Sequence, residues 1–138
     1  MIILDTNVVS ELMAERPNPA VIGYLDNTEE EILLNAISVA EIRYGLALLP
    51  NGNRKRRLTD AFDLLLSELG DNRVLDFSNA ATGHYANICA SARRAGKTVS
   101  MAHAMIAAIC VLHAAPLITR NIRDFKHTGI ELINPWES

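Results

Sequence analysis

Aromatic residues, cysteines and excess positive charge are all scarce in this chain of 138 residues. Aromatic side chains make up 5 % of it, so the core has to be built from Leu, Ile, Val and Ala. The two cysteines, Cys89 and Cys110, lie in helical patterns without the spacing of metal ligands, which predicts buried free thiols. The net charge of −3 gives no global positive field that would attract nucleic acid. Any contact with RNA or DNA therefore has to use a local patch.

A cleaved leader and a membrane-spanning segment are not expected either. Met1 opens directly into the apolar run of a strand, which leaves no place for a signal peptide. The most apolar stretch, residues 104–118, contains His113 and Pro116 and is too short to cross a bilayer. Hydrophobic residues make up 49 % of the chain and charged residues 21 %, a balance that supports a packed core. We expect one cytoplasmic domain over residues 1–138.

Short apolar runs alternate with helical patterns along the whole chain. The expected strands are residues 1–4, 32–35, 73–77, 116–119 and 131–133. The expected helices are residues 8–14, 19–26, 38–49, 54–69, 78–95 and 101–115, with a loop or single turn over 121–125. Ser38, Ser78 and Ser100 are the predicted N-caps, and Ser38 forms a capping box with Glu41. This alternation predicts an α/β fold, a three-layer α/β/α sandwich around a parallel sheet.

Acidic residues recur near the ends of the predicted strands. Asp5 directly follows the first strand, Glu41 lies in the helix after the second, and Asp124 lies just after the fourth. If the first strand is central, the chain order reverses beside it and opens a crevice at the carboxyl ends of the strands. Carboxylates gathered there would need a proton or a cation, and oxygen ligands favour Mg²⁺ or Mn²⁺. The alternative is that Asp5 only caps the helix that follows it.

Several short motifs are spread from one end of the chain to the other. They are Leu4-Asp5-Thr6-Asn7, Ser38-Val39-Ala40-Glu41 with Arg43 and Gly45, Ile106-Ala107-Ala108, Thr119-Arg120-Asn121 with Asp124-Phe125, and Asn134-Pro135-Trp136. In their order and spacing the chain resembles PIN-domain proteins, and closely the VapC/FitB group of toxin–antitoxin ribonucleases. The resemblance implies a five-stranded parallel sheet of order 3-2-1-4-5 and an endoribonuclease site that uses Mg²⁺ or Mn²⁺. It also implies a homodimer, or a larger complex, inhibited by a VapB-type antitoxin.

The resemblance assigns site residues one by one. The acidic positions of the family are matched by Asp5, Glu41 and Asp124. Thr6 and Asn121 match polar residues that support them. Arg120 lies beside the predicted crevice, where it is as credible a contact for a phosphate or a partner as it is a structural residue.

His103 is the one departure from the family pattern. It stands three residues before Ile106, where family members place an aspartate as a further metal ligand. Position 103 is also where an acid would complete a capping box with Ser100. A histidine offers at most one neutral nitrogen donor and no negative charge. Mg²⁺ should therefore bind more weakly, while Mn²⁺ or Zn²⁺ would tolerate the nitrogen better.

Three interpretations of His103 are open: an inactivating substitution, a natural variant with altered metal preference, and a site repurposed for binding. They support two functions. The first is a metal-dependent endoribonuclease toxin, weakened or inactive in this copy. The second is a catalytically inactive PIN module that binds its antitoxin and acts in autoregulation. An aspartyl-phosphate mechanism of the haloacid-dehalogenase type needs Asp-x-Asp, whereas position 7 is Asn.

Surface features add three weaker expectations. An antitoxin is expected to bind around residues 8–12 and 42–49 and to place a basic side chain in the acidic pocket. The basic run 54–57 is either a solvated helix start or a contact for RNA phosphates. Trp136 is expected to pack the carboxy-terminal tail onto the sheet.

Overall fold

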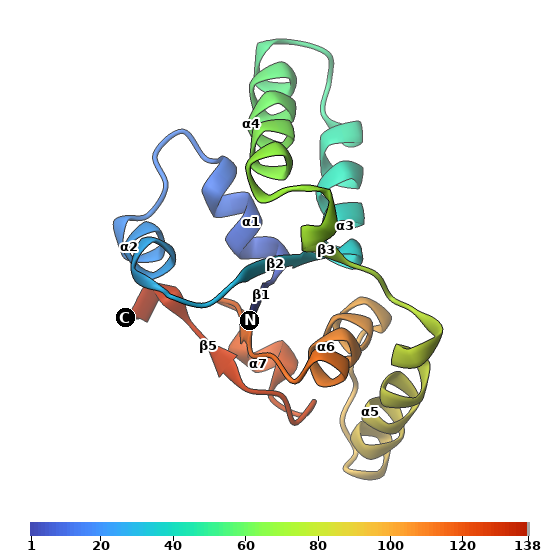
Figure 1. Ribbon diagram of the computed structural model, residues 1–138. Helices are drawn as coiled ribbons and strands as arrows, with labels where there is room; N and C mark the ends of the chain where they lie inside the picture. The colour runs from blue at the N-terminus through green and yellow to red at the C-terminus, as the bar shows by residue number, and fades with distance from the viewer. Residues whose placement is uncertain (138) are drawn as a thin grey trace.

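Five short parallel strands form the centre of the computed structural model, which describes residues 1–137 (Figure 1). They are β1 (Ile2–Leu4), β2 (Ile32–Asn35), β3 (Val74–Leu75), β4 (Leu117–Ile118) and β5 (Leu132–Ile133). Their order in the sheet is β3-β2-β1-β4-β5, as expected. The chain order therefore reverses beside β1, between β2 and β4, which places a crevice at the carboxyl end of β1.

Helices cover both faces of this sheet. They are α1 (Thr6–Met13), α2 (Pro19–Asn27), α3 (Ala36–Leu48), α4 (Asn53–Leu69), α5 (Thr82–Arg94), α6 (Met101–His113) and the single turn α7 (Ile122–Phe125). One core joins the sheet to α5 and α6, and a second joins it to α1, α2, α3 and α4. Figure 1 shows the same division, with α5 and α6 on one side of the strands. The three-layer α/β/α sandwich is confirmed.

The apolar run at the start of the chain supplies both cores. Ile2 and Leu4 pack into the core of α1 to α4, whereas Ile3 packs into that of α5 and α6. All three side chains are at most 2 % exposed. Because side chains alternate across a strand, a strand with both faces buried has to be apolar at every position. Burial of each such side chain contributes about 1.5–3 kcal/mol to stability.

Two helices start earlier than their sequence signals indicated. Asp5 itself is the N-cap of α1, so this helix begins at Thr6 and not at residue 8. Asn35 is the N-cap of α3, and its Oδ1 accepts a hydrogen bond from the amide of Ser38 at 2.8 Å. The predicted capping box of Ser38 and Glu41 is therefore wrong. The cap of the first turn is Asn35, three residues before the predicted one, and Ser38 is therefore buried inside the helix.

The two other predicted serine caps had different outcomes. Ser78 precedes a 3₁₀ turn, η2 (Asn79–Ala81), and makes no side-chain capping bond, so α5 begins only at Thr82. Ser100 caps α6 as predicted, because its hydroxyl accepts a hydrogen bond from the amide of His103 at 3.1 Å. The structure thus fixes His103 in the first turn of α6.

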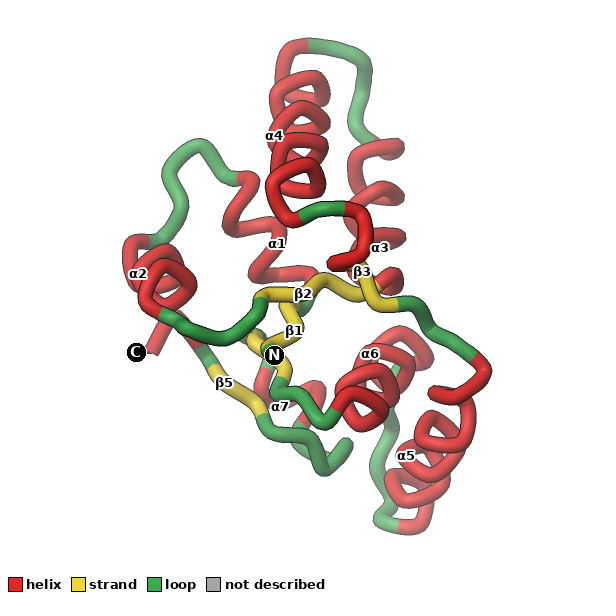
Figure 2. The backbone as a smooth tube through the Cα atoms, in the orientation of Figure 1, coloured by secondary structure: helices red, strands yellow, loops and turns green. Residues whose placement is uncertain are grey.

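The remaining outcomes concern the thiols and the tail. Cys110 is buried and Cys89 only partly so, and both are free. The short turn η3 (Pro135–Glu137) packs against α2, and Trp136 contacts the core that joins the sheet to α1, α2, α3 and α4. The tail was expected on the sheet and rests mainly on α2. Within residues 1–137, no helix has the length and apolar character needed to cross a membrane. Figure 2 shows α3 and α4 joined by a short loop into a hairpin that rises from the sheet.

Candidate active site

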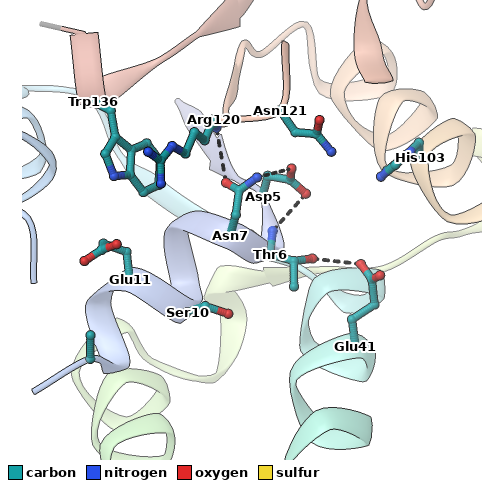
Figure 3. Close-up of a pocket in the computed structure, with 11 residues that line it drawn as sticks. Asp5, Thr6, Asn7, Ser10, Glu11, Glu41, His103, Arg120, Asn121 and Trp136 are labelled. Carbon is teal, nitrogen blue, oxygen red and sulfur yellow. Dashed lines mark hydrogen bonds between the residues drawn. The ribbon is translucent and has the colours of Figure 1, made fainter. Parts of the chain in front are cut away.

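A pocket of about 480 Å³ lies at the carboxyl end of β1 (Figure 3). Its walls come from the end of β1, from α1 along its length, from Glu41 on α3, from the first turn of α6, from the loop after β4 and from η3. The lining residues are Asp5, Thr6, Asn7, Ser10, Glu11, Ala14, Glu41, His103, Arg120, Asn121 and Trp136. The structure therefore gathers six of the seven predicted site residues, all except Asp124, around one cavity.

Asp5 is the most buried of these polar residues, at 4 % exposure. Its Oδ1 accepts a hydrogen bond from the amide of Thr6 at 2.8 Å, and its Oδ2 accepts one from the hydroxyl of Thr119 at 2.8 Å. Burial raises the pKa of Asp5 above its ordinary value, and these hydrogen bonds only partly oppose that effect. The charge of nearby His103 also lowers this pKa, whereas that of Glu41 raises it. Asp5 is thus both a helix cap and a pocket carboxylate.

Replacing Asp5 with Asn is expected to stabilise the fold at neutral pH. The folded chain binds the proton of Asp5 more tightly than the unfolded chain, whose reference pKa is 3.8. The free energy of unfolding therefore falls as the pH rises through the raised pKa, because the buried carboxyl loses its proton. Below pH 3.8 Asp5 is protonated in both states, and this loss of stability vanishes. Asn keeps the capping oxygen but carries no charge. Asp5→Asn should raise the melting temperature at pH 7, by roughly 4 °C for each kcal/mol relieved.

The measurement is thermal unfolding of both chains between pH 4 and pH 8. The difference in melting temperature should shrink as the pH falls. Asp63→Asn, the same change at an exposed position of α4, should show no such dependence. A destabilised Asp5→Asn chain at every pH would mean that the lost Thr119 contact outweighs the relief of charge burial.

A chain of hydrogen bonds orients Glu41, which is exposed at the pocket rim. The Thr6 hydroxyl lies 2.8 Å from Glu41 Oε1 and 2.9 Å from the Ser38 hydroxyl. Asn35 Nδ2 lies 3.0 Å from both the Ser38 hydroxyl and the Leu4 carbonyl. A carboxylate only accepts, so Thr6 donates to Glu41 and Ser38 donates to Thr6. The buried Asn35 thereby ties Glu41 to the end of β1.

Asp124 is the predicted site residue that does not line the pocket. It is exposed on α7, and its Oδ2 accepts a hydrogen bond from Asn121 Nδ2 at 2.6 Å. The Asn121 amide in turn donates to the Thr119 hydroxyl at 2.9 Å. Asn121 thus lines the cavity in place of Asp124. It also links Asp124 to the Thr119 hydroxyl, which donates a hydrogen bond to Asp5.

His103 closes the side of the pocket opposite Arg120 in Figure 3. Its ring lies 4.7 Å from that of Phe125 in a tilted contact, which packs α6 against α7. Within residues 1–137, no three His, Cys, Asp or Glu side chains stand close enough to hold a metal ion. The donor set therefore does not fit a cage of three protein ligands. It fits a cation held by one or two carboxylates, Asp5 and Glu41, with water as the other ligands, as is common for Mg²⁺.

Four lining residues, three on α1 and one at its C-cap, were not predicted as site residues. Asn7, Ser10, Glu11 and Ala14 recur at helical spacing on one face of α1, a signal that was present in the sequence. Trp136 was not predicted to line the site either. Its motif, Asn134-Pro135-Trp136, was part of the family resemblance, but its place at the pocket depends on the packing of η3 against α2.

An apolar groove of about 490 Å³ continues from this pocket between α1, α3 and α4. The two cavities share Thr6, Ser10, Ala14 and Glu41. The rest of the groove is lined by Met13, Glu15, Ile42, Gly45, Leu46, Leu49, Arg54, Arg57 and Leu58. Of the two segments at which a partner was expected to dock, residues 42–49 line the groove at four positions, whereas residues 8–12 line it at Ser10 alone. The groove ends at the basic run of α4.

Comparisons with known proteins agree with this architecture. The family model for the PIN domain matches residues 2–131. The plasmid stability protein StbB of Pseudomonas syringae pv. tomato is 40 % identical over 100 % of both chains. The VapC ribonuclease Y4jK of Sinorhizobium fredii is 39 % identical over 99 % of both chains.

Solved structures give the same result. The crystal structure of FitAcB from Neisseria gonorrhoeae contains a chain that is 37 % identical and superimposes with a TM-score of 0.90 over 100 % of both chains. Further structures of this fold are toxin–antitoxin complexes, some of them bound to DNA. The chain thus belongs to the PIN-domain family, within the group of VapC and FitB toxins.

Proposed function

We propose that this chain is a metal-dependent endoribonuclease toxin of a type II toxin–antitoxin module, weakened by His103. Residues 1–138 act as a single PIN domain. The chain acts in the cytoplasm, where RNA substrates are found. The observation that carries the proposal is the meeting of Asp5 and Glu41 in one pocket at the carboxyl end of β1. The name of the ribonuclease relative Y4jK supports the choice of RNA as substrate.

Each site residue has a distinct role in this proposal. Asp5 and Glu41 would hold Mg²⁺ or Mn²⁺, which when bound activates water and neutralises charge on the phosphodiester. Thr6 fixes the orientation of Glu41 through its hydrogen bond. Asn121 holds the carboxylate of Asp124 outside the cavity, where it adds negative charge near the site. Arg120 lines the same pocket and faces the RNA substrate there.

His103 explains why the activity is proposed to be weak. An imidazole, unlike a carboxylate, brings no negative charge to a pocket that has to retain a divalent cation. Its contact with Phe125 further holds the ring in the packing between α6 and α7. Of the two metals, Mn²⁺ should support more cleavage than Mg²⁺, because it accepts a nitrogen ligand more readily.

The test is cleavage of RNA by the purified chain in Mn²⁺ and in EDTA. Cleavage is expected in Mn²⁺ only, and Asp5→Asn should lower it by about 100-fold, the scale of loss when one group that stabilises transition-state charge is removed. Asp63→Asn, on the exposed side of α4, is the matched control and should cleave normally. Cleavage that persists in EDTA or in Asp5→Asn would contradict the assignment of the site.

The same module requires an antitoxin, which we place in the groove between α1, α3 and α4. Its apolar floor suits an amphipathic helix, and its open connection to the pocket would let a basic side chain reach Asp5 and Glu41. We further propose a homodimer. Tyr44 and Leu48 on α3 are 68 % and 67 % exposed, which supports a surface covered by a second chain.

The alternative function is a PIN module without catalysis that binds its antitoxin and acts in autoregulation. His103 and the lack of a three-ligand cluster among the described residues favour it. DNA in some complexes of related structures is consistent with such a role. The cleavage assay separates the two functions, because the alternative requires equal results in Mn²⁺ and EDTA together with retained antitoxin binding.

A further inference from the structure

We propose that Arg120 and Trp136 form a nucleobase-stacking subsite that binds the RNA nucleotide next to the scissile phosphate. This inference rests on the proposed ribonuclease function and names a specificity element within its site. The Cζ atom of Arg120 lies 5.1 Å from the centroid of the Trp136 ring. Both side chains line the cavity that Asp5 lines, and Figure 3 shows them together at the end opposite His103.

The stack has a fixed position relative to the carboxylate. The amide of Arg120 donates to Asn7 Oδ1 at 3.2 Å. Asn7 Nδ2 is 3.4 Å from Asp5 Oδ2 and 3.3 Å from the Thr119 hydroxyl. One asparagine side chain therefore joins the backbone of Arg120 to Asp5. A nucleotide that stacks on Arg120 would be held in register with the reacting group.

The tryptophan is anchored independently from the other side. Its backbone is held in place because its amide donates to Asn134 Oδ1 at 3.0 Å and because η3 packs against α2. The Trp136 side chain is only partly buried and still faces the pocket. The indole thus backs the guanidinium, whose planar group can stack on an aromatic ring and on a base.

The charges of the pocket favour a base over a lone phosphate as the ligand of this pair. Arg120 is the one Lys or Arg side chain among the lining residues, against the carboxyl groups of Asp5, Glu11 and Glu41. A phosphate placed here would meet a single Lys or Arg side chain among several acidic ones. Stacking does not depend on the net charge of the pocket, and the polar side chains of Asn7 and Ser10 stand along the same wall.

Trp136 is the single tryptophan of the chain, so its fluorescence reports on this subsite alone. The full chain is titrated in EDTA, at low salt, with a short RNA oligonucleotide and with versions that lack one base at each position in turn. We expect saturable quenching, and one abasic position that weakens binding about tenfold. Arg120→Lys keeps the charge but removes the planar group, and should also weaken binding of the complete oligonucleotide about tenfold.

The decisive readout is the coupling between the two changes. If the base stacks on Arg120, Arg120→Lys should have little further effect on the oligonucleotide abasic at that position. Arg123→Lys, the same change at an exposed position of α7, is the control and should bind normally. Additive effects would identify a phosphate contact only and overturn the subsite. Binding seen by anisotropy of an end-labelled oligonucleotide without a change in tryptophan fluorescence, or no binding at all, would overturn it as well.

This experiment does not depend on cleavage. Coupling found in a chain that shows no Mn²⁺-dependent cleavage would leave the subsite standing and remove the ribonuclease proposal. Mn²⁺-dependent cleavage without coupling would leave the ribonuclease proposal standing and remove the subsite.

Discussion

Replacing His103 with Asp is expected to raise Mn²⁺- and Mg²⁺-dependent RNA cleavage by about tenfold or more, the usual scale for restoring a group that supports a metal site. The new carboxylate would stand in the same pocket as Asp5 and Glu41. It would add a negative oxygen donor to the pocket wall that His103 now forms. The gain should be larger with Mg²⁺ than with Mn²⁺, because Mg²⁺ tolerates nitrogen ligands less.

The substitution should also be compatible with the fold. Position 103 is the third residue of α6, where a negative charge faces the positive end of the helix dipole and can complete the capping box with Ser100. The measurement is the initial rate of cleavage at several concentrations of each metal. His127→Asp, on an exposed loop, is the matched control. If His103→Asp leaves cleavage unchanged while Asp5→Asn abolishes it, position 103 has no part in the chemistry.

Filling the groove at Gly45 is expected to weaken binding of the cognate VapB-type antitoxin by about 100-fold, equivalent to roughly 2.7 kcal/mol. Gly45 lies on α3 and lines the groove, and a Cβ atom added there would meet nothing within 4 Å. A phenylalanine at this position would therefore leave α3 intact and occupy the space that the partner helix requires. Phenylalanine also has a slightly higher helix propensity than glycine, because it leaves the unfolded backbone less freedom.

Gly23→Phe is the matched control for this variant. Gly23 also lies inside a helix, α2, and a Cβ atom added there would likewise meet open space, but it does not line the groove. Affinity is measured by calorimetry with the purified antitoxin, and protection of growth by co-expression. Equal affinity of Gly45→Phe and Gly23→Phe for the antitoxin would place the partner on another surface. The Asp5 pocket would be unaffected by that result.

Asp5 illustrates the conflict between stability and the proposed activity at this site. The residue is almost fully buried, and burial raises its pKa, so its ionisation is less favourable than that of an exposed aspartate. A carboxylate kept in that state is suited to bind a divalent ion, since the ion relieves the cost of burying the charge. The same residue caps α1 and lines the pocket, so the cap interpretation is confirmed and does not exclude the proposed role in the site.

The sequence predicted the element types and the sheet well, because the signals involved are local or come from family motifs. The apolar run from Ile2 to Leu4 indicated a strand buried on both faces, and the structure has Ile3 paired with Leu33 on one side and with Leu117 on the other. Helix starts were predicted less well. After β2, Ser38 and Glu41 have the spacing of a capping box, but Asn35 caps α3 three residues earlier. Local capping signals that overlap within three residues cannot be ranked without the structure.

The sequence by itself determined the composition of the core, the order of strands and helices, and the set of residues from which a site could be built. The tertiary structure alone decided which of them share a pocket: it brought Trp136 and Arg120 to Asn7, linked Asn35 to Glu41, and left Asp124 outside the cavity. The physical reason is the range of the forces involved. Hydrophobic periodicity and capping act between neighbours along the chain, whereas a pocket depends on crossover connections and sheet register, which place residues more than a hundred positions apart within hydrogen-bonding distance.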